Sequence, residues 1–222
     1  MIASIHQPNF FPWLGYFDKI NKSDSFIFLT LSQRSSSDKY FTRTNIALNG
    51  ETKYLSIPFG KQEPIISDLA MPDDKKWIQK HLNLLKNAYS KSIYFEEIYN
   101  DIEMLYLFDL EYYFEFSINI IEFFMKKLNI NTKTYIDLEF KKDFGKSNMR
   151  NINLSKHINA TTYLSGTGAQ VYNDIELFKQ KDLDLIYQEF KYTQYSLSIL
   201  DTVFMLGFEK TEELLFKSAS FE

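Results

Sequence analysis

The stretch "MIASIHQPNFFPWLGYFDKINKSDSFIFLTL", residues 1–31, predicts a strand, a helix and a second strand. "MIASI" has the length and apolar character of a short strand, and Pro8 ends it because the residue before a proline is pushed toward extended geometry. Pro12 suits the first turn of a helix whose apolar residues recur at helical spacing over residues 13–20. "SFIFLTL" (25–31) is a continuous apolar run, as expected of a strand covered on both faces. The stretch therefore indicates a β-α-β unit.

The last third of the chain repeats the same alternation. "KTYIDLEF" (133–140), "TTYLSG" (161–166) and "LDLIYQEF" (183–190) have the character of strands, and helical patterns lie between them at 147–158 and 174–181. Strands that alternate with helices are typical of a parallel sheet with crossover helices. A final helix is expected from Ser198, with Asp201 closing a capping box, to the neighbourhood of Gly207.

Two segments interrupt this pattern. Asn49 and Gly50 stand between two strand-like runs, which is a strong signal for an antiparallel hairpin. Residues 73–144 contain neither glycine nor proline, and three amphipathic helical patterns lie within this segment. We therefore predict one α/β domain over residues 1–222 with a mainly parallel sheet, a small hairpin and an all-helical insert. The α/β core comprises residues 1–72 and 130–222, and the insert residues 73–129.

The composition limits the classes of function that the protein can have. The 222 residues are 45% hydrophobic, so the chain can bury a sizeable core, and the net charge of −4 provides no basic footprint for nucleic acid. The absence of cysteine excludes a thiolate nucleophile and any cysteine-based metal site. The N-terminus lacks the pattern of a signal peptide and no run is long enough to span a membrane, so we expect a cytoplasmic protein.

The first strand–helix junction is the principal candidate site. His6 and Gln7 follow the first strand, at the edge of a parallel sheet where ligands bind, and the helix after them offers free N–H groups to an anion. A histidine in this position can act as a general base, so we assign His6 and Gln7 catalytic roles. The neighbouring aromatic residues are expected to belong to the core, except Tyr16, whose hydroxyl can contact a substrate.

Other candidates lie further along the chain. Arg43, Asn45 and Lys61, in or near the hairpin, are candidates for binding a phosphate or carboxylate, or are ordinary solvated residues. His81 falls on the apolar face of its helix, where it is a second candidate base or a buried structural histidine. The loop "YLSGTGAQVYND" (163–174) lets a backbone approach a ligand closely, which adds the remaining substrate-binding candidates Ser165, Gly166, Gly168 and Tyr172. No carboxylate cluster has metal-ligand spacing, so no metal is inferred.

Several blocks of the sequence resemble one known family. "IHQPNFFPWLGYFDKI", "SDSFIFL", "RTN" before "IPF", Trp77, His81 and Tyr89 in one helix, "YLSGTGAQVY" and "LSILDTVFMLG" are similar, in this order, to the WbqC-like family. The resemblance implies a role in the biosynthesis of O-antigen or other surface polysaccharides, and it adds Tyr89 to the substrate-binding candidates. The segment "FKYTQYSLSILD" is shorter than the family pattern, which leaves the roles of Tyr192, Gln194 and Asp201 open.

The resemblance favours an enzyme that transfers an acyl or aminoacyl group to a nucleotide-linked amino sugar. His6 would be the base, the backbone of residues 166–168 or the first helix N-terminus would stabilise an oxyanion, and Arg43 and Lys61 would hold the diphosphate. The donor would be a thioester of CoA or of an acyl carrier protein.

Two alternatives stay open. The first is a HUP-like nucleotidyl-transferring or adenylate-forming enzyme that uses ATP and Mg²⁺, although Tyr16 stands where the second histidine of the H-x-G-H motif would be. The second is a non-catalytic module that binds a sugar or a carrier protein. The aromatic helical segment also leaves room for a homodimer interface.

Overall fold

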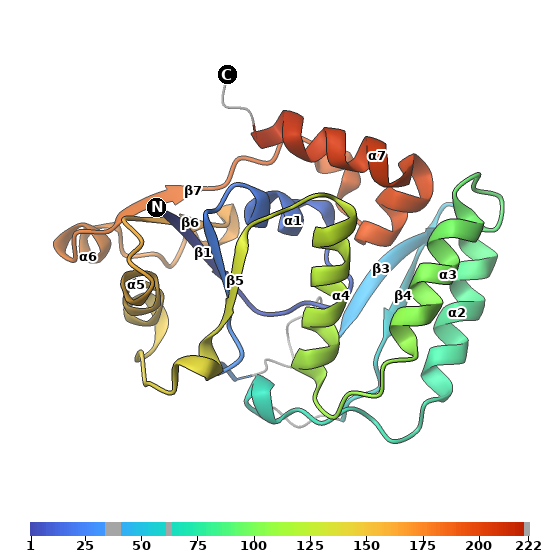
Figure 1. Ribbon diagram of the computed structural model, residues 1–222, viewed down its shortest axis with the longest axis horizontal. Helices are drawn as coiled ribbons and strands as arrows, with labels where there is room; N and C mark the ends of the chain where they lie inside the picture. The colour runs from blue at the N-terminus through green and yellow to red at the C-terminus, as the bar shows by residue number, and fades with distance from the viewer. Residues whose placement is uncertain (34–40, 61–63, 220–222) are drawn as a thin grey trace.

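A parallel five-stranded sheet forms the centre of the computed structural model, which describes residues 1–33, 41–60 and 64–219 (Figure 1). The strands lie in the order β5-β2-β1-β6-β7, and all four neighbouring pairs are parallel. Their bounds are Ile2–His6 (β1), Ser25–Phe28 (β2), Lys133–Ile136 (β5), Thr162–Ser165 (β6) and Asp184–Tyr187 (β7). The predicted α/β class is confirmed.

Helices cover both faces of this sheet. α1 (Leu14–Asn21), α4 (Tyr113–Lys127) and α7 (Ile199–Ala219) lie on one side, and α5 (Ser147–His157) and α6 (Ile175–Gln180) on the other (Figure 1). Side chains alternate along β1, so that Ala3 and Ile5 join the core under α5 and α6. His6 therefore points to the opposite face, toward α1.

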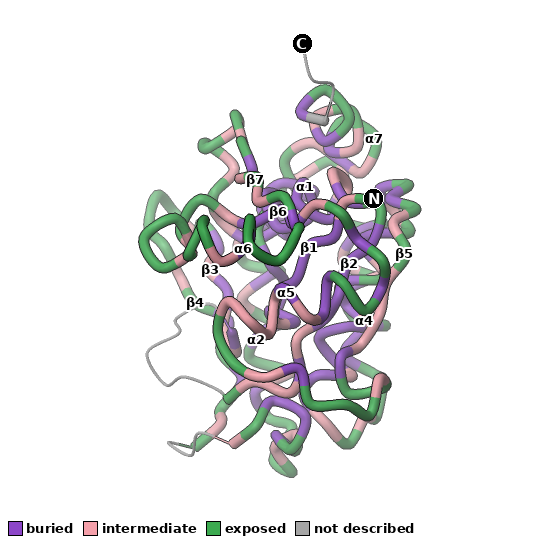
Figure 2. The backbone as a smooth tube through the Cα atoms, turned by 90° about the vertical axis from the view of Figure 1, so that its left-hand side faces the viewer, coloured by how far each residue is buried: buried purple, intermediate pink, exposed green. Residues whose placement is uncertain are grey.

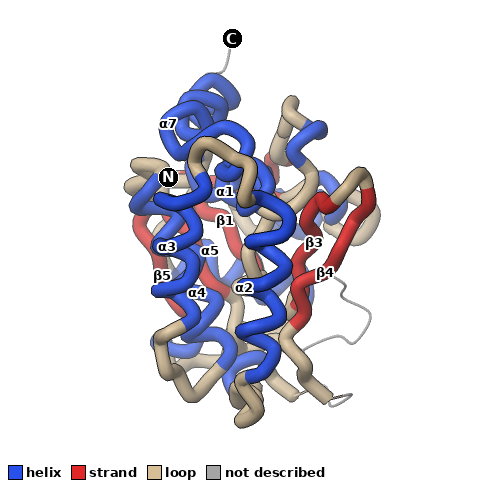
Figure 3. The backbone as a smooth tube through the Cα atoms, turned by 90° about the vertical axis from the view of Figure 1, so that its right-hand side faces the viewer, coloured by secondary structure: helices blue, strands red, loops and turns tan. Residues whose placement is uncertain are grey.

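The predicted hairpin and helical segment are also present. β3 (Arg43–Leu48) and β4 (Glu51–Ser56) pair antiparallel, and Asn49 and Gly50 have φ angles of 53° and 77°, as a two-residue type I′ turn requires. α2 (Lys76–Tyr89) and α3 (Phe95–Tyr106) run beside α4 and the hairpin (Figure 3). Apolar residues of α2, α3 and α4 share one core cluster with α1, β2 and α7. Figure 2 shows that most of β1 and β2 is buried.

The boundaries of three elements differ from the predictions. α1 begins at Leu14, two residues after Pro12. β5 ends at Ile136, because the buried Asp137 begins a 3₁₀ turn (Asp137–Phe140) and its carboxylate accepts the N–H groups of Thr30 and Leu31. α7 does not stop at Gly207; it kinks there, where φ is 77°, and continues to Ala219.

The strand order places a topological switch point at β1. The chain moves from β1 to β2 on one side and later returns to β6 on the other side of β1. Ligands of open α/β sheets bind beyond the carboxyl ends of the strands at such a point. Here the ends of β1 and β6 are His6 and Ser165.

In the described part of the chain, no helix is long and apolar enough to cross a membrane.

Candidate functional site

Two cavities meet at the carboxyl end of β1. The first has a volume of about 500 Å³ and lies between α1, the loop after β6 and the segment after β7. The second has a volume of about 450 Å³ and lies between the β1–α1 loop and the start of β3. His6 and Trp13 line both of them. These two side chains therefore form the boundary between two neighbouring binding spaces.

The tautomer of His6 is determined by its neighbours. Its Nδ1 atom lies 3.1 Å from the carbonyl oxygen of Gln7, which can only accept, so Nδ1 carries the proton. The Tyr16 hydroxyl donates to the same carbonyl at 2.8 Å, and its ring packs edge-on against the imidazole with centroids 5.0 Å apart. Nε2 consequently bears the lone pair, and no described residue hydrogen-bonds it. The arrangement presents an unprotonated ring nitrogen at the cavity boundary.

Burial keeps the imidazole neutral. Desolvation, with a smaller contribution from the nearby positive charge of Lys19, lowers the pKa of His6 to about 4. Burial also raises the pKa of the Tyr16 hydroxyl well above its usual value. At neutral pH the site therefore contains an uncharged base and an uncharged phenol.

Lys19 is a buried amine in the wall of the first cavity. Its side chain lies in the second turn of α1, is only 5% exposed and donates to the Ile5 carbonyl at 2.9 Å. Desolvation lowers the pKa of Lys19 to about 7. The amine therefore changes between its charged and neutral forms near physiological pH.

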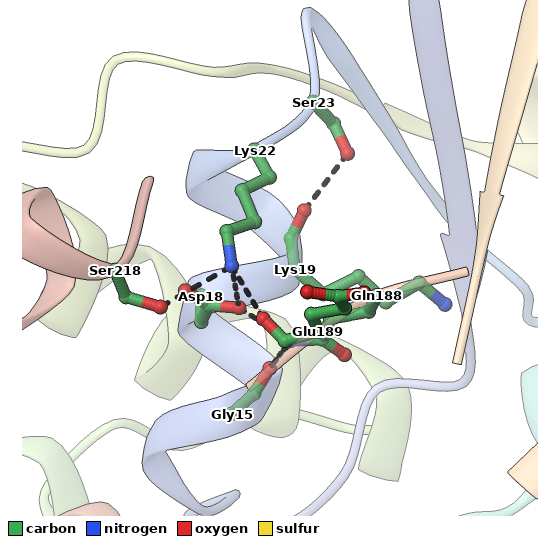
Figure 4. A network of polar contacts seen from close by, with 8 residues as sticks. All are labelled: Gly15, Asp18, Lys19, Lys22, Ser23, Gln188, Glu189 and Ser218. Atoms are coloured by element: carbon green, nitrogen blue, oxygen red, sulfur yellow. Dashed lines mark hydrogen bonds and ion pairs between the residues drawn. The ribbon is translucent and has the colours of Figure 1, made fainter. Parts of the chain in front are cut away.

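A polar network supports the helix that carries Lys19 (Figure 4). The carboxylate of Asp18 is fully buried; it accepts from Gln188 Nε2 at 2.7 Å and pairs with Lys22 at 3.0 Å. Gln188 Nε2 also donates to the Gly15 carbonyl at 2.7 Å. These contacts attach α1 to the segment after β7, two of the three elements that enclose the first cavity.

Trp13 lies directly over Gly15. A Cβ atom added to Gly15 would come within 2.3 Å of the indole ring, so only glycine leaves the ring in this position. The ring also packs edge-on with Phe190, with centroids 5.1 Å apart. Trp13 is 37% exposed, which gives a ligand an aromatic surface between the two cavities.

Comparisons with known proteins show the family of this chain. The model of the WbqC-like protein family matches residues 7–213. The chain belongs to the WbqC-like protein family. A Mycobacterium tuberculosis (strain ATCC 25618 / H37Rv) protein named "Uncharacterized protein Rv1507c" is 26% identical over 228 residues, and the alignment covers 96% of each chain. No solved structure matches this WbqC-like chain.

Some of the predicted site residues lie together in this WbqC-like protein. His6, Tyr16, Gly166 and Gly168 line the first cavity. Ser165 lies next to it but is buried, and its hydroxyl accepts from Asn173 at 3.0 Å. The glycine loop therefore brings main-chain groups toward the cavity that His6 borders.

The other predicted site residues border the second cavity or lie at neither of the two cavities. Arg43 and Asn45 line the second cavity. Gln7 contributes its main-chain carbonyl, whereas its side-chain Oε1 is buried and has no hydrogen-bond partner among the described residues. Tyr172 is 65% exposed and lines neither cavity. Lys61 lies outside the described residues.

His81 lies away from this boundary, in a third space beside β4. Its Nε2 donates to the Ser56 carbonyl at 3.2 Å, so its Nδ1 accepts from the Tyr106 hydroxyl at 3.1 Å. Desolvation lowers the pKa of His81 to about 4. Because both ring nitrogens have partners within the protein, the geometry favours a structural role, and a catalytic role for His81 stays an untested prediction.

Tyr89 and Asp201 form a buried pair that joins α2 to α7. The Tyr89 hydroxyl donates to the Asp201 carboxylate, which also accepts the Ala47 N–H at 3.2 Å. Burial raises the pKa of Asp201. The predicted capping box is wrong, because the N–H of Ser198 donates to the Asn45 carbonyl and not to Asp201. Asp201 instead connects three separate parts of the fold.

The sequence prediction missed Lys19, Trp13 and Gln188. The sequence pattern predicts a core position for Trp13 and no functional role for Lys19 or Gln188. One signal was present in the printed sequence: the pair Asp18-Lys19 interrupts an otherwise apolar helix, and charges among apolar residues need partners or a ligand when buried. Among the described residues, no group of three histidine or acidic side chains could hold a metal ion.

Proposed function

We propose that this protein transfers an acyl or aminoacyl group to the amine of a nucleotide-linked amino sugar, in surface polysaccharide biosynthesis in the cytoplasm. The WbqC-like family is linked to polysaccharide biosynthesis. The observation that carries the reaction type is the unprotonated Nε2 of His6 at the boundary of two cavities. Two substrates that react with one another need two adjoining spaces and a base between them.

The bond changes follow from this placement. The sugar amine, in its neutral form, attacks the thioester carbonyl, and His6 Nε2 takes the proton that the nitrogen loses as the C–N bond forms. Main-chain N–H groups of residues 166–168 or of the start of α1 stabilise the oxyanion. The intermediate then collapses, the C–S bond breaks, and the protonated His6 returns the proton to the leaving thiolate. The products are an amide and a free thiol.

The absence of cysteine makes the released thiol easy to measure. We expect a thiol-reactive dye to report release of CoA from acyl-CoA in the presence of a nucleotide-linked amino sugar, with no background from the protein. His6→Gln should lower turnover about a hundredfold or more while substrate binding is retained. His157→Gln, on the opposite face of the sheet between Phe140 and Phe144, is the matched control.

Three outcomes contradict this proposal. Turnover by His6→Gln at the wild-type rate would remove the base from the mechanism. If the wild type binds the sugar without any turnover and His6→Gln loses this binding, a non-catalytic sugar-binding or carrier-binding module would be favoured. If the wild type modifies no amino sugar with either a CoA or a carrier-protein thioester, acyl transfer is excluded.

The strand order favours a second candidate, a nucleotidyl-transferring or adenylate-forming enzyme. Numbered within the parallel sheet alone, the strands run third, second, first, fourth and fifth, the arrangement of doubly wound nucleotide-binding folds. Such an enzyme would use ATP and Mg²⁺, and the protein's part would be to bind the phosphates near His6. Release of pyrophosphate or AMP from ATP in the presence of an acid or amino acid substrate would favour this candidate over acyl transfer.

A further inference from the structure

Lys19 is a buried amine whose charged form has no counter-charge among the described residues. Its only hydrogen bond within the described residues is to the Ile5 carbonyl, which leaves two N–H groups of the ammonium form without partners. The carboxylate beside it in sequence, Asp18, binds Lys22 and Gln188 through Oδ2, and no described hydrogen bond or ion pair joins it to Lys19 (Figure 4). An ammonium group taken out of water is costly unless an anion pairs with it.

The start of α1 borders the same cavity and has no side-chain cap. Its N-cap residue, Trp13, makes no side-chain capping bond, and the first turn contains no acidic residue. The first N–H groups of a helix and its dipole favour an anion. Gly15, in this first turn, lines the first cavity together with Lys19. A buried cation and an uncapped helix start therefore border one space.

We infer that Lys19 and the start of α1 form a phosphate subsite in the first cavity, and that the diphosphate of the nucleotide-linked substrate binds there. This inference rests on the proposed function. It places the diphosphate on the β6 side of Trp13, whereas Arg43 lines the second cavity and would contact another part of the substrates. The acceptor sugar then extends from the first cavity past Trp13, so that its amine reaches His6.

The other titratable groups of the cavity do not replace this counter-charge. His6 and Tyr16 face Lys19 from β1 and from its own helix, and both are uncharged at neutral pH. Glu189 and Lys191 line the cavity from the segment after β7; they are exposed and opposite in charge. Burial lowers the pKa of Lys19 to about 7, and a phosphate beside the amine would favour its protonated form and raise this pKa.

Calorimetric titration with inorganic pyrophosphate tests the subsite. We expect Lys19→Met to weaken pyrophosphate binding by about tenfold or more, since a charge-assisted hydrogen bond is lost. Lys179→Met, an exposed lysine of α6, is the control matched in net charge and should change the affinity by less than about twofold. Equal affinity of Lys19→Met and wild type, or no binding by the wild type, would overturn the inference.

A pH series on the wild type keeps the test valid if Lys19→Met does not fold. The charge of sulfate is constant around neutral pH, so a change in its affinity reports the protein. We expect sulfate binding to weaken by about tenfold per pH unit above pH 7 as Lys19 loses its proton. An affinity that does not change with pH would contradict the subsite.

The experiments distinguish a failure of the subsite from a failure of the proposed reaction. Pyrophosphate binding that depends on Lys19, without any acyl transfer, would leave the subsite standing and remove the reaction. Acyl transfer with an unchanged KM for the nucleotide-linked sugar in Lys19→Met would remove the subsite and leave the reaction.

Discussion

The contact between Trp13 and Gly15 can be tested by adding one methyl group. In Gly15→Ala the new Cβ would stand 2.3 Å from the indole ring, whereas ordinary contacts begin near 3.4 Å. The ring must therefore move by about 1.1 Å or leave its position. Trp13 forms the boundary between the two cavities, so this movement changes both of them.

The free energy of unfolding should change little, because two effects oppose each other. Alanine is favoured over glycine within a helix by about 1 kcal/mol. Loss of the edge contact between Trp13 and Phe190, together with an off-rotamer side chain, costs about 1 to 3 kcal/mol. We expect a net destabilisation of no more than about 2 kcal/mol. The variant should fold, but with its substrate boundary displaced.

Tryptophan emission measures this displacement directly. Trp13 and Trp77 are the only tryptophans, so Trp77→Phe leaves Trp13 as the sole reporter. In that background Gly15→Ala should shift the emission to longer wavelength and weaken ligand binding as strongly as Trp13→Ala does. Gly60→Ala, where a Cβ would meet nothing within 4 Å, is the control. Unchanged emission and unchanged binding in Gly15→Ala would refute the packing argument.

Two further predictions concern stability. The pKa of both His6 and His81 is about 4 in the native state, below the value near 6.5 of an unfolded chain, so the unfolded state binds more protons between these pH values. The free energy of unfolding should therefore fall by up to about 1.4 kcal/mol per pH unit for each histidine as pH drops from about 6.5 to 4. Denaturant titrations at several pH values should show that the free energy of unfolding of His81→Gln depends less steeply on pH than that of the wild type. The same pH dependence in both proteins would disprove the lowered pKa of His81. Tyr89→Phe should cost about 1 to 3 kcal/mol in the same assay, because Asp201 keeps its burial and loses a donor. A loss no larger than that of the exposed Tyr54→Phe would contradict this.

The elements of the sheet were predictable because they depend on local patterns. Alternation of apolar runs with amphipathic segments predicted each strand, and Pro8 correctly marked the end of β1, which places His6 at the sheet edge. Boundaries were predicted less well where a distant group intervenes. The carboxylate of Asp137 turns toward Thr30, more than a hundred residues earlier, and this contact ends β5.

The site itself was only partly predictable, because burial of a polar group depends on tertiary packing. His6 could be placed from its position after a strand. Lys19 could not, since its partner is a carbonyl of β1 and its neighbour Asp18 binds Gln188, 170 residues further along the chain. Trp13 has the spacing of a core residue, and only the absence of a Cβ on Gly15 shows why its ring lies along the cavities.

The backbone at Phe11 connects the site to the rest of the fold. Phe11 has a φ of 40°, an uncommon conformation for a bulky side chain, which costs on the order of 1 kcal/mol or more. Its carbonyl accepts from the hydroxyls of Thr44 and Ser198, both at 2.9 Å. The hairpin and the start of α7 thus hold the β1–α1 loop in a conformation that the loop alone would not adopt. This loop connects His6 to Trp13. The two hydrogen bonds that offset the free energy cost at Phe11 therefore fix the relative position of the two side chains that border both cavities.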